Sequence, residues 1–300
     1  MSITKPAIST LIGATLTMPD PAVVAEHYVR HFGYRIDSTG KVDAATAKVW
    51  GAPKQEGAQT IILRATSGLP QWLRFVEHPE RHAQPLRTLG WNAIELSVKA
   101  VDTLKAPLEG TPFKWLSGPH FLSGGTSTIK AMQVEGPAGE VVYLTQIPDE
   151  PDKKHLPKAT VPVDRLFIVV LGTADSRAAQ RWYMDRFDVI ERPYRETPIK
   201  CINKAHGRPE NALSSLASVS LKEDGMFEID GYPDTAVPRP VKEGYLPAGF
   251  AMVTAAASGL APWLNLRGGT APANRDLHMG RAKIATITGP AGEVVELAVP

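Results

Sequence analysis

Hydrophobic and polar residues form a strand pattern followed by a helix pattern, and this pair of patterns recurs along the chain. Residues 13–36 begin with the period-two alternation of a strand, turn at Asp20, and continue with apolar residues at helical spacing up to Gly33. Residues 168–190 repeat this plan, with Asp175 in the place of Asp20. An Asp before such a run is typical of a helix N-cap, and a Gly after it is typical of a helix end.

Each half of the chain continues in the same way. Apolar runs of strand length follow, and a second strand–helix pattern begins at Gly90 in one half and at Gly249 in the other. Each half then ends on one hairpin sequence, GPAGEVVYL at 136–144 and GPAGEVVEL at 289–297, which differ only at the eighth position. Repetition of this kind predicts four modules of strand–helix–strand–strand–strand, two in each half.

A segment rich in Pro, Lys and Asp separates the halves. Residues 148–162 lack the periodicity of a helix or strand, so we expect an extended linker. The prediction is an α+β fold of two tandem domains, residues 1–147 and 163–300, each made of two modules. The repeat does not determine whether modules pair within each half or across the halves.

Composition narrows the functional classes. The net charge of +2, without a basic stripe or acidic tail, argues against a nucleic-acid partner. The first sixteen residues are too short and too polar for a signal peptide or a membrane span. A single cysteine, Cys201, excludes an internal disulfide and favours a reducing compartment. We expect a cytoplasmic protein, without membrane association, that is a monomer or homodimer acting on a small molecule.

The modules and their hairpins resemble the vicinal oxygen chelate superfamily, which contains glyoxalases, bleomycin-resistance proteins and extradiol dioxygenases. The resemblance covers nearly the whole chain, and GPAGEVVEL is its best-matching piece. It implies glyoxalase-like domains in which two βαβββ modules form a cupped mixed sheet around a substrate. The layout of four modules is similar to that of extradiol dioxygenases.

The resemblance also implies positions for a divalent metal, with a His from the first strand of a module and a Glu from its last strand. Glu228 and Glu296 occupy last-strand positions and are the candidate ligands for Fe, Mn, Zn or Ni. The first-strand position holds Ile168 in one C-terminal module and Ala251 or Met252 in the other. Two carboxylates without a histidine make a poor iron site, so a metal-free site is an equal alternative.

The N-terminal half has fewer candidate metal ligands than the C-terminal half. Its corresponding positions hold Gly13, Arg74, Asn92 or Ala93, and Tyr143, so no metal is expected there and the chemistry is expected in the C-terminal cup.

Strand alternation suggests a role for the two carboxylates. Val295 and Leu297 share one face of their strand, so Glu296 faces the other way, and Glu228 does the same in its own strand. Two carboxylates facing one cavity would raise the pKa of one of them and provide an acid and a base. This arrangement suits proton abstraction next to a carbonyl, as in an isomerase, epimerase or lyase acting on a carbonyl or aromatic compound. The structural alternative is a carboxylate held by Arg165, Arg281 or Lys283.

Further candidates come from long loops and from the positions that replace the family's ligands. The expected catalytic residues are Glu296, Glu228, His206 and His278, and the expected substrate-binding residues are Arg281, Arg165, Tyr143, Arg74 and His120. Two other functions stay open, a binding protein that sequesters an aromatic ligand and a divergent extradiol-type dioxygenase. An interaction module has the least support, because no amphipathic stripe or charge run is present.

Overall fold

The strand–helix–strand–strand–strand pattern recurs in the computed structural model, which describes residues 4–82, 84–122, 127–150, 156–261, 264, 273–276 and 281–299. The first module contains β1 (Ile8–Met18), α1 (Pro21–Phe32), β2 (Arg35–Lys41), α2 (Ala44–Val49), η1 (Pro53–Gln55), β3 (Gln59–Arg64) and β4 (Trp72–Glu77). The second contains β5 (Gly90–Val98), η2 (Val101–Thr103), α3 (Lys105–Leu108), β6 (Lys114–Phe121), β7 (Lys130–Glu135) and β8 (Val141–Gln146). The third contains β9 (Val163–Thr173), α4 (Ser176–Arg186), β10 (Ile190–Pro198), α5 (Lys200–Ala205), β11 (Leu213–Ser220) and β12 (Met226–Gly231). The described part of the fourth contains β13 (Gly249–Ala257), β14 (Ala273–Asp276), β15 (Arg281–Thr288) and β16 (Val294–Val299).

The two long helices begin at the residues that the sequence predicts. The side chain of Asp20 accepts a hydrogen bond from the backbone N–H of Val23 at 3.0 Å, and Asp175 accepts one from Ala178 at 2.9 Å. Gly33 ends α1 with a φ of 69°, a conformation that L side chains rarely adopt. The predicted strand–helix plan is therefore confirmed at both sites.

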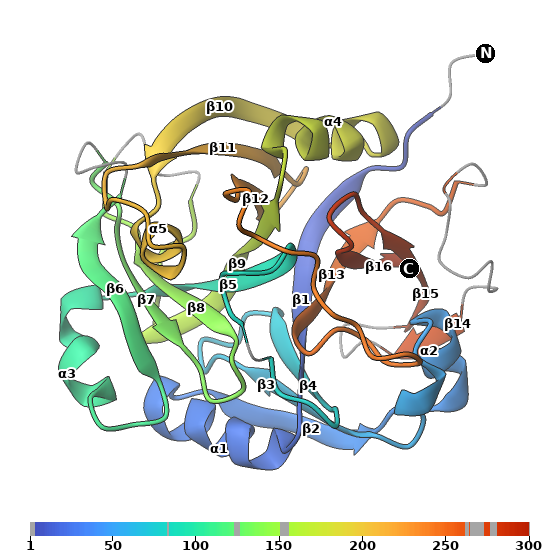
Figure 1. Ribbon diagram of the computed structural model, residues 1–300. Helices are drawn as coiled ribbons and strands as arrows, with labels where there is room; N and C mark the ends of the chain where they lie inside the picture. The colour runs from blue at the N-terminus through green and yellow to red at the C-terminus, as the bar shows by residue number, and fades with distance from the viewer. Residues whose placement is uncertain are drawn as a thin grey trace.

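Modules pair across the halves of the chain. One eight-stranded sheet has the order β14-β15-β16-β13-β1-β4-β3-β2 and joins the first and fourth modules, which we call the outer cup. The other has the order β10-β11-β12-β9-β5-β8-β7-β6 and joins the second and third modules, which we call the inner cup. Figure 1 shows the inner cup on the left and the fourth module on the right.

This pairing corrects the expectation that residues 1–147 and 163–300 each form a cup of their own. The first strands of paired modules meet in antiparallel ladders, β1 on β13 and β5 on β9. Both ladders join strands from opposite sides of the linker, 148–162, whose described residues contain no helix or strand. A local periodicity predicts each strand but carries no information about a partner so distant in the chain.

The main hydrophobic core fills the space behind the two cups. Alternate residues of the central strands enter it, such as Leu96, Val169, Phe227 and Leu297, together with residues of α1 and α4. Since strand side chains alternate between faces, the intervening residues point into the cups.

The repeated hairpin ties the two cups together. In the first copy, Glu140 accepts hydrogen bonds from the Tyr28 hydroxyl at 2.9 Å and from the backbone N–H two residues earlier at 2.9 Å. In the second copy, Glu293 accepts the same two bonds, from Tyr183 and from the backbone, both at 2.8 Å. A β-carbon on the glycine that opens either hairpin would lie 1.9 Å from this carboxylate, so a larger residue would displace the carboxylate from these hydrogen bonds. Each bond joins a helix of one cup to a hairpin of the other, which gives the repeat a structural role.

Among the described residues, no helix has the length and apolar character that crossing a membrane requires.

Candidate functional site

The floor of the outer cup is a buried ion pair. Arg74 on β4 donates from Nη2 to Oε1 of Glu296 on β16 at 2.9 Å, and Glu296 is 0% exposed. Glu296 also accepts hydrogen bonds from Thr254 at 2.7 Å and from the indole N–H of Trp50 at 2.6 Å. Both carboxylate oxygens are therefore occupied by donors from this chain.

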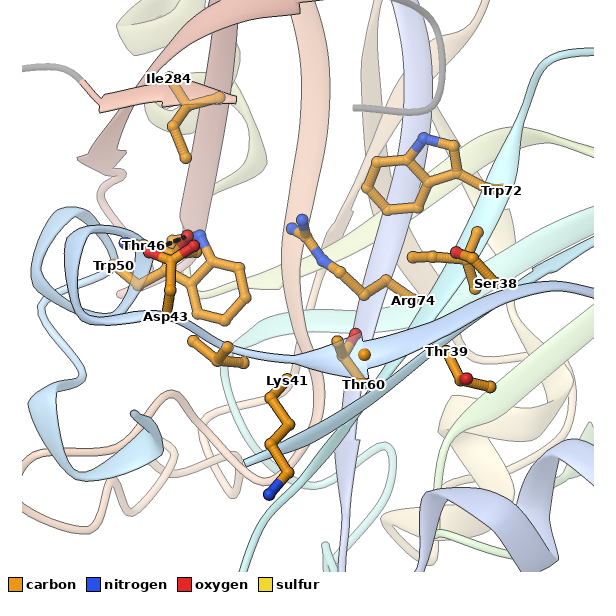
Figure 2. A pocket seen from close by; sticks show the side chains of 13 residues that line it. Ser38, Thr39, Lys41, Asp43, Thr46, Trp50, Thr60, Trp72, Arg74 and Ile284 are labelled. Atoms are coloured by element: carbon orange, nitrogen blue, oxygen red, sulfur yellow. Dashed lines mark hydrogen bonds between the residues drawn. The ribbon is translucent and has the colours of Figure 1, made fainter. Parts of the chain in front are cut away.

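Two tryptophans flank the Arg74 guanidinium, whose central carbon lies 4.7 Å from the Trp50 ring centre and 4.8 Å from that of Trp72. Figure 2 shows Arg74 between them. The three side chains line a cavity of about 250 Å³. The Trp72 ring lies against Gly13 on β1, where a β-carbon would come within 2.3 Å of it. The ring thus fills the space that a ligand side chain from the first strand would need.

The inner cup encloses a larger cavity, of about 410 Å³, with two carboxylates on its floor. Glu95 on β5 lies opposite Ile168 of β9, and Glu228 on β12 lies beside Val170 of the same strand. The two carboxylates therefore lie on either side of β9. Glu95 is 4% exposed and Glu228 is partly exposed to the cavity.

The environments of these carboxylates differ. Burial and the charge of Glu228 raise the pKa of Glu95 to about 8, against a weaker opposing effect of the hydrogen bond from Thr145. Burial also raises the pKa of Glu228, but the positive charge of Arg195 opposes that rise. At neutral pH a pKa of about 8 keeps Glu95 protonated, and Arg195 favours the ionised form of Glu228 against the effect of burial.

A third acid, Asp230, follows Glu228 by two residues on β12. Asp230 is 0% exposed, and neither of its carboxylate oxygens has a hydrogen-bond partner among the described residues. Burial, followed by the charges of Glu228 and Glu95, raises its pKa well above the ordinary value. Both effects favour the protonated form of Asp230.

Solved structures with the same fold are similar to this chain over nearly its whole length. Glyoxalase I from Zea mays is similar over 97% of this chain and 92% of its own, with a TM-score of 0.64 and 13% identity. A putative dioxygenase from Bacillus subtilis subsp. subtilis str. 168 is similar over 98% of this chain and 86% of its own, with a TM-score of 0.64 and 10% identity. The chain has the vicinal oxygen chelate fold. No protein-family model and no curated protein matches the sequence.

The metal positions of the vicinal oxygen chelate fold do not fit a divalent cation in the outer cup. There the guanidinium of Arg74 already supplies a positive charge to Glu296, and the nearby first-strand side chains are Thr15, which accepts from Arg74 at 2.9 Å, and Thr254. Metal ions with N and O ligands need free acceptors, and these acceptors are already bonded.

The inner cup fits a metal no better. At the positions where the family has metal ligands, Ile168 has no ligand atom and the Tyr143 hydroxyl is in contact with the Cys201 sulfur at 3.1 Å. Of the described residues on the floor of this cavity, only Glu95 and Glu228 are left to bind a metal ion. Within the described ranges, no three His, Cys, Asp or Glu side chains converge as a metal site requires.

The predicted pair of carboxylates is divided between the cups. Glu228 lies in the inner cup and Glu296 in the outer cup, so the expectation that they act together, as acid and base or as metal ligands, is wrong. The cause is the pairing of modules across halves. Arg74, assigned to a separate N-terminal cup, is instead the partner of Glu296.

The other predicted substrate-binding residues have different positions. Tyr143 and His120 line the inner cavity, and burial followed by the charge of Lys200 lowers the pKa of His120. Arg165 is not a partner of either candidate carboxylate, because it pairs with Asp224 at 2.5 and 3.1 Å.

Of the remaining candidates, only His206 is described with its side chain. It donates from Nε2 to the Leu86 carbonyl at 2.9 Å and contacts the Thr235 hydroxyl at 2.6 Å, outside the lining of the inner cavity. His278 and the side chain of Arg281 lie outside the described residues.

Sequence reasoning missed Glu95, the residue that completes the inner pair. Counting along the second module placed the ligand position at Asn92 or Ala93, and β5 carries a register shift between Trp91 and Ala93. Alternation from Ala93 was the available signal, since it places Glu95 on the same face.

Proposed function

We propose that this protein is an enzyme of the vicinal oxygen chelate type that transfers protons on a small carbonyl compound bound in the inner cup. The observation that carries the proposal is the pair formed by Glu95 and Glu228, two acids that line one cavity, of which only Glu228 has a positive charge, that of Arg195, favouring its ionised form. Groups whose environments separate their pKa values in this way are suited to act as acid and base.

The proposed step needs no external redox partner. The Glu228 carboxylate takes a proton from the carbon next to the substrate carbonyl, and Glu95 gives its proton to the carbonyl oxygen. The product of this step is an enol, and both protons are accounted for. Return of a proton to the carbon gives isomerisation or epimerisation, whereas loss of a leaving group from the neighbouring carbon gives elimination. The position of the two carboxylates on either side of β9 supports access to two sides of a bound substrate.

The surroundings support the assignment of roles. Arg195 favours the ionised form of Glu228, and the hydrogen bond from Thr145 orients Glu95. Apolar residues such as Phe167 and Ile168 form part of the cavity lining, and next to them charges act more strongly than in bulk water.

Exchange of substrate hydrogen in D₂O tests the proposal. Proton NMR of a panel of oxo acids, ketones and hydroxyketones should reveal a compound whose α-hydrogen exchanges only with the protein present. Glu228→Gln and Glu95→Gln should each slow that exchange by about 10²- to 10⁴-fold, the range for a lost general acid or base. Glu191→Gln, an exposed position on β10, is the matched control and should leave it unchanged.

The alternative is a binding protein for an aromatic ligand. Saturable binding in the inner cup without exchange, isomerisation or elimination of any bound carbonyl compound would support that function and contradict the proposal. Dioxygen uptake in the presence of added Fe²⁺ would instead support a divergent dioxygenase.

A further inference from the structure

We infer that the substrate of the inner cup carries a carboxylate, which Arg195 and Arg192 of β10 bind at the wall of the cavity. The inference rests on the proposed function, since it names the class of compound on which that site acts. The predicted class is a small oxo acid with an apolar body.

The charged residues of the cavity favour an anion. Arg192, Arg195 and Lys200 line the cavity, and of these Lys200 pairs with Glu210 at 3.7 Å. Apart from the proposed base Glu228 and the protonated Glu95, the acids among the described residues of the lining are Asp224 and Glu223, and both have partners. Asp224 pairs with Arg165, and Glu223 accepts a hydrogen bond from the Thr10 hydroxyl at 3.2 Å.

The two arginines have donors available. Arg192 uses Nε in a hydrogen bond to the Ser220 hydroxyl at 2.7 Å, and neither of its terminal nitrogens is bonded within the described part of the chain. Arg195 forms no salt bridge or side-chain hydrogen bond with any described residue. A guanidinium presents paired N–H groups that match the two oxygens of a carboxylate.

The position of Arg195 defines where the carboxylate would lie on the substrate. Arg195 on β10 and Glu228 on β12 line the same cavity with only β11 between their strands, so an anion bound to Arg195 lies on the side of the cavity where the base stands. The carbon that loses a proton to Glu228 is therefore the carbon that bears the carboxylate or its neighbour. The guanidinium would also stabilise negative charge that develops on that carboxylate as the proton leaves.

The rest of the lining accommodates an apolar body. Leu122, Ile129 and Ile147 from the second module line it, with Phe167 and Met226 from the third. A substrate with a charged end and a hydrocarbon end would place each against a matching surface.

Calorimetric titration with three unreactive probes of one skeleton tests the inference. Phenylacetate should bind, and phenylacetamide, which lacks the charge, should bind at least tenfold more weakly. Arg195→Gln should weaken phenylacetate binding by about 10- to 100-fold, as expected for loss of a hydrogen-bonded charge, and Arg195→Lys should restore part of it. Arg181→Gln, an exposed position on α4, is the matched control.

Equal affinity for phenylacetate and phenylacetamide, or unchanged binding by Arg195→Gln, would overturn the inference. Tighter binding of benzylphosphonate, with the same dependence on Arg195, would replace the carboxylate with a phosphate. The two proposals fail separately. If the protein exchanges the α-hydrogen of neutral ketones as fast as that of oxo acids, and Arg195→Gln does not change either rate, the inference is contradicted but the proposed function is not. Arg195-dependent binding of phenylacetate without exchange of any carbonyl compound would contradict the function alone.

Discussion

Replacement of Glu296 by Gln should destabilise the fold without affecting the inner cup. Glu296 is fully buried, its charge is balanced by Arg74 at 2.9 Å, and three donors occupy its two oxygens. A glutamine keeps the shape but removes the negative charge, so the buried guanidinium is left uncompensated. Its amide N–H groups also face a donor, because only one of its two terminal atoms accepts hydrogen bonds.

Removing one partner of a buried ion pair typically costs about 3–5 kcal/mol, and we expect Glu296→Gln to lower the free energy of unfolding by this amount. Urea unfolding followed by far-ultraviolet circular dichroism measures the change. Tryptophan fluorescence is less suitable, because Trp50 contacts the altered residue. The midpoint should move to lower urea with an unchanged slope.

The double variant Arg74→Met/Glu296→Leu sharpens the test. Removing both charges leaves no buried ion without a partner, so the double variant should be more stable than Glu296→Gln alone by about 2 kcal/mol or more. A loss below about 1 kcal/mol for Glu296→Gln, or a double variant less stable than the single one, would refute the reasoning. Stoichiometric divalent metal in the native protein that disappears in Glu296→Gln would show instead that Glu296 is a metal ligand.

Two further predictions concern the outer cup and the repeated hairpins. Gly13→Ala should lower the free energy of unfolding by about 1–3 kcal/mol, because the added β-carbon would overlap the Trp72 ring. The control is Gly40→Ala, whose β-carbon meets nothing closer than 3.7 Å and should change the free energy of unfolding by less than about 1 kcal/mol. Equal losses of stability in the two variants, measured by thermal unfolding, would contradict this prediction. Burial raises the pKa of both Glu140 and Glu293 from 4.5 to about 7. Between these two pH values the folded protein keeps both carboxyl groups protonated, whereas the unfolded chain has released the protons. The free energy of unfolding should therefore fall as the pH rises from about 4.5 to about 7. Each glutamate should contribute about 3 kcal/mol to that fall, and the Gln variants should flatten the profile of unfolding free energy against pH; an unchanged profile would contradict the assignment.

Local features of the fold were predictable from the sequence. The caps at Asp20 and Asp175 follow from short-range hydrogen bonding, and the cup-facing orientation of Glu228 and Glu296 follows from strand alternation. Each of these features depends on residues within one helix turn or one strand.

The composition of the candidate site was not predictable in the same way. Arg74 and Glu296 are separated by 222 positions, and they meet because β1 pairs with β13, the first strand of the fourth module, and not with β5, the first strand of the other module in its own half. A repeat reveals that modules exist, but each first strand has similar hydrogen-bonding groups and could pair with either candidate partner.

The sequence did not reveal the position of Glu95, because that position depends on the register of β5 as well as on the pairing of modules. A bulge in β5 shifts the count of residues, so a position transferred from the family's pattern fell on Asn92 or Ala93. The raised pKa of Glu95 then depends on burial and on Glu228, which lies in another module.

The central claim is that Glu95 and Glu228 form one coupled pair in the inner cup, and carboxyl ¹³C NMR titration tests it most directly. We predict that Glu95 titrates near pH 8 in the native protein. Glu228→Gln should lower that pKa because it removes the neighbouring charge, whereas Glu296→Gln should leave it unchanged because Glu296 lies in the outer cup. A Glu95 that titrates near 4.5 in all three proteins, or that responds to Glu296 and not to Glu228, would contradict the account.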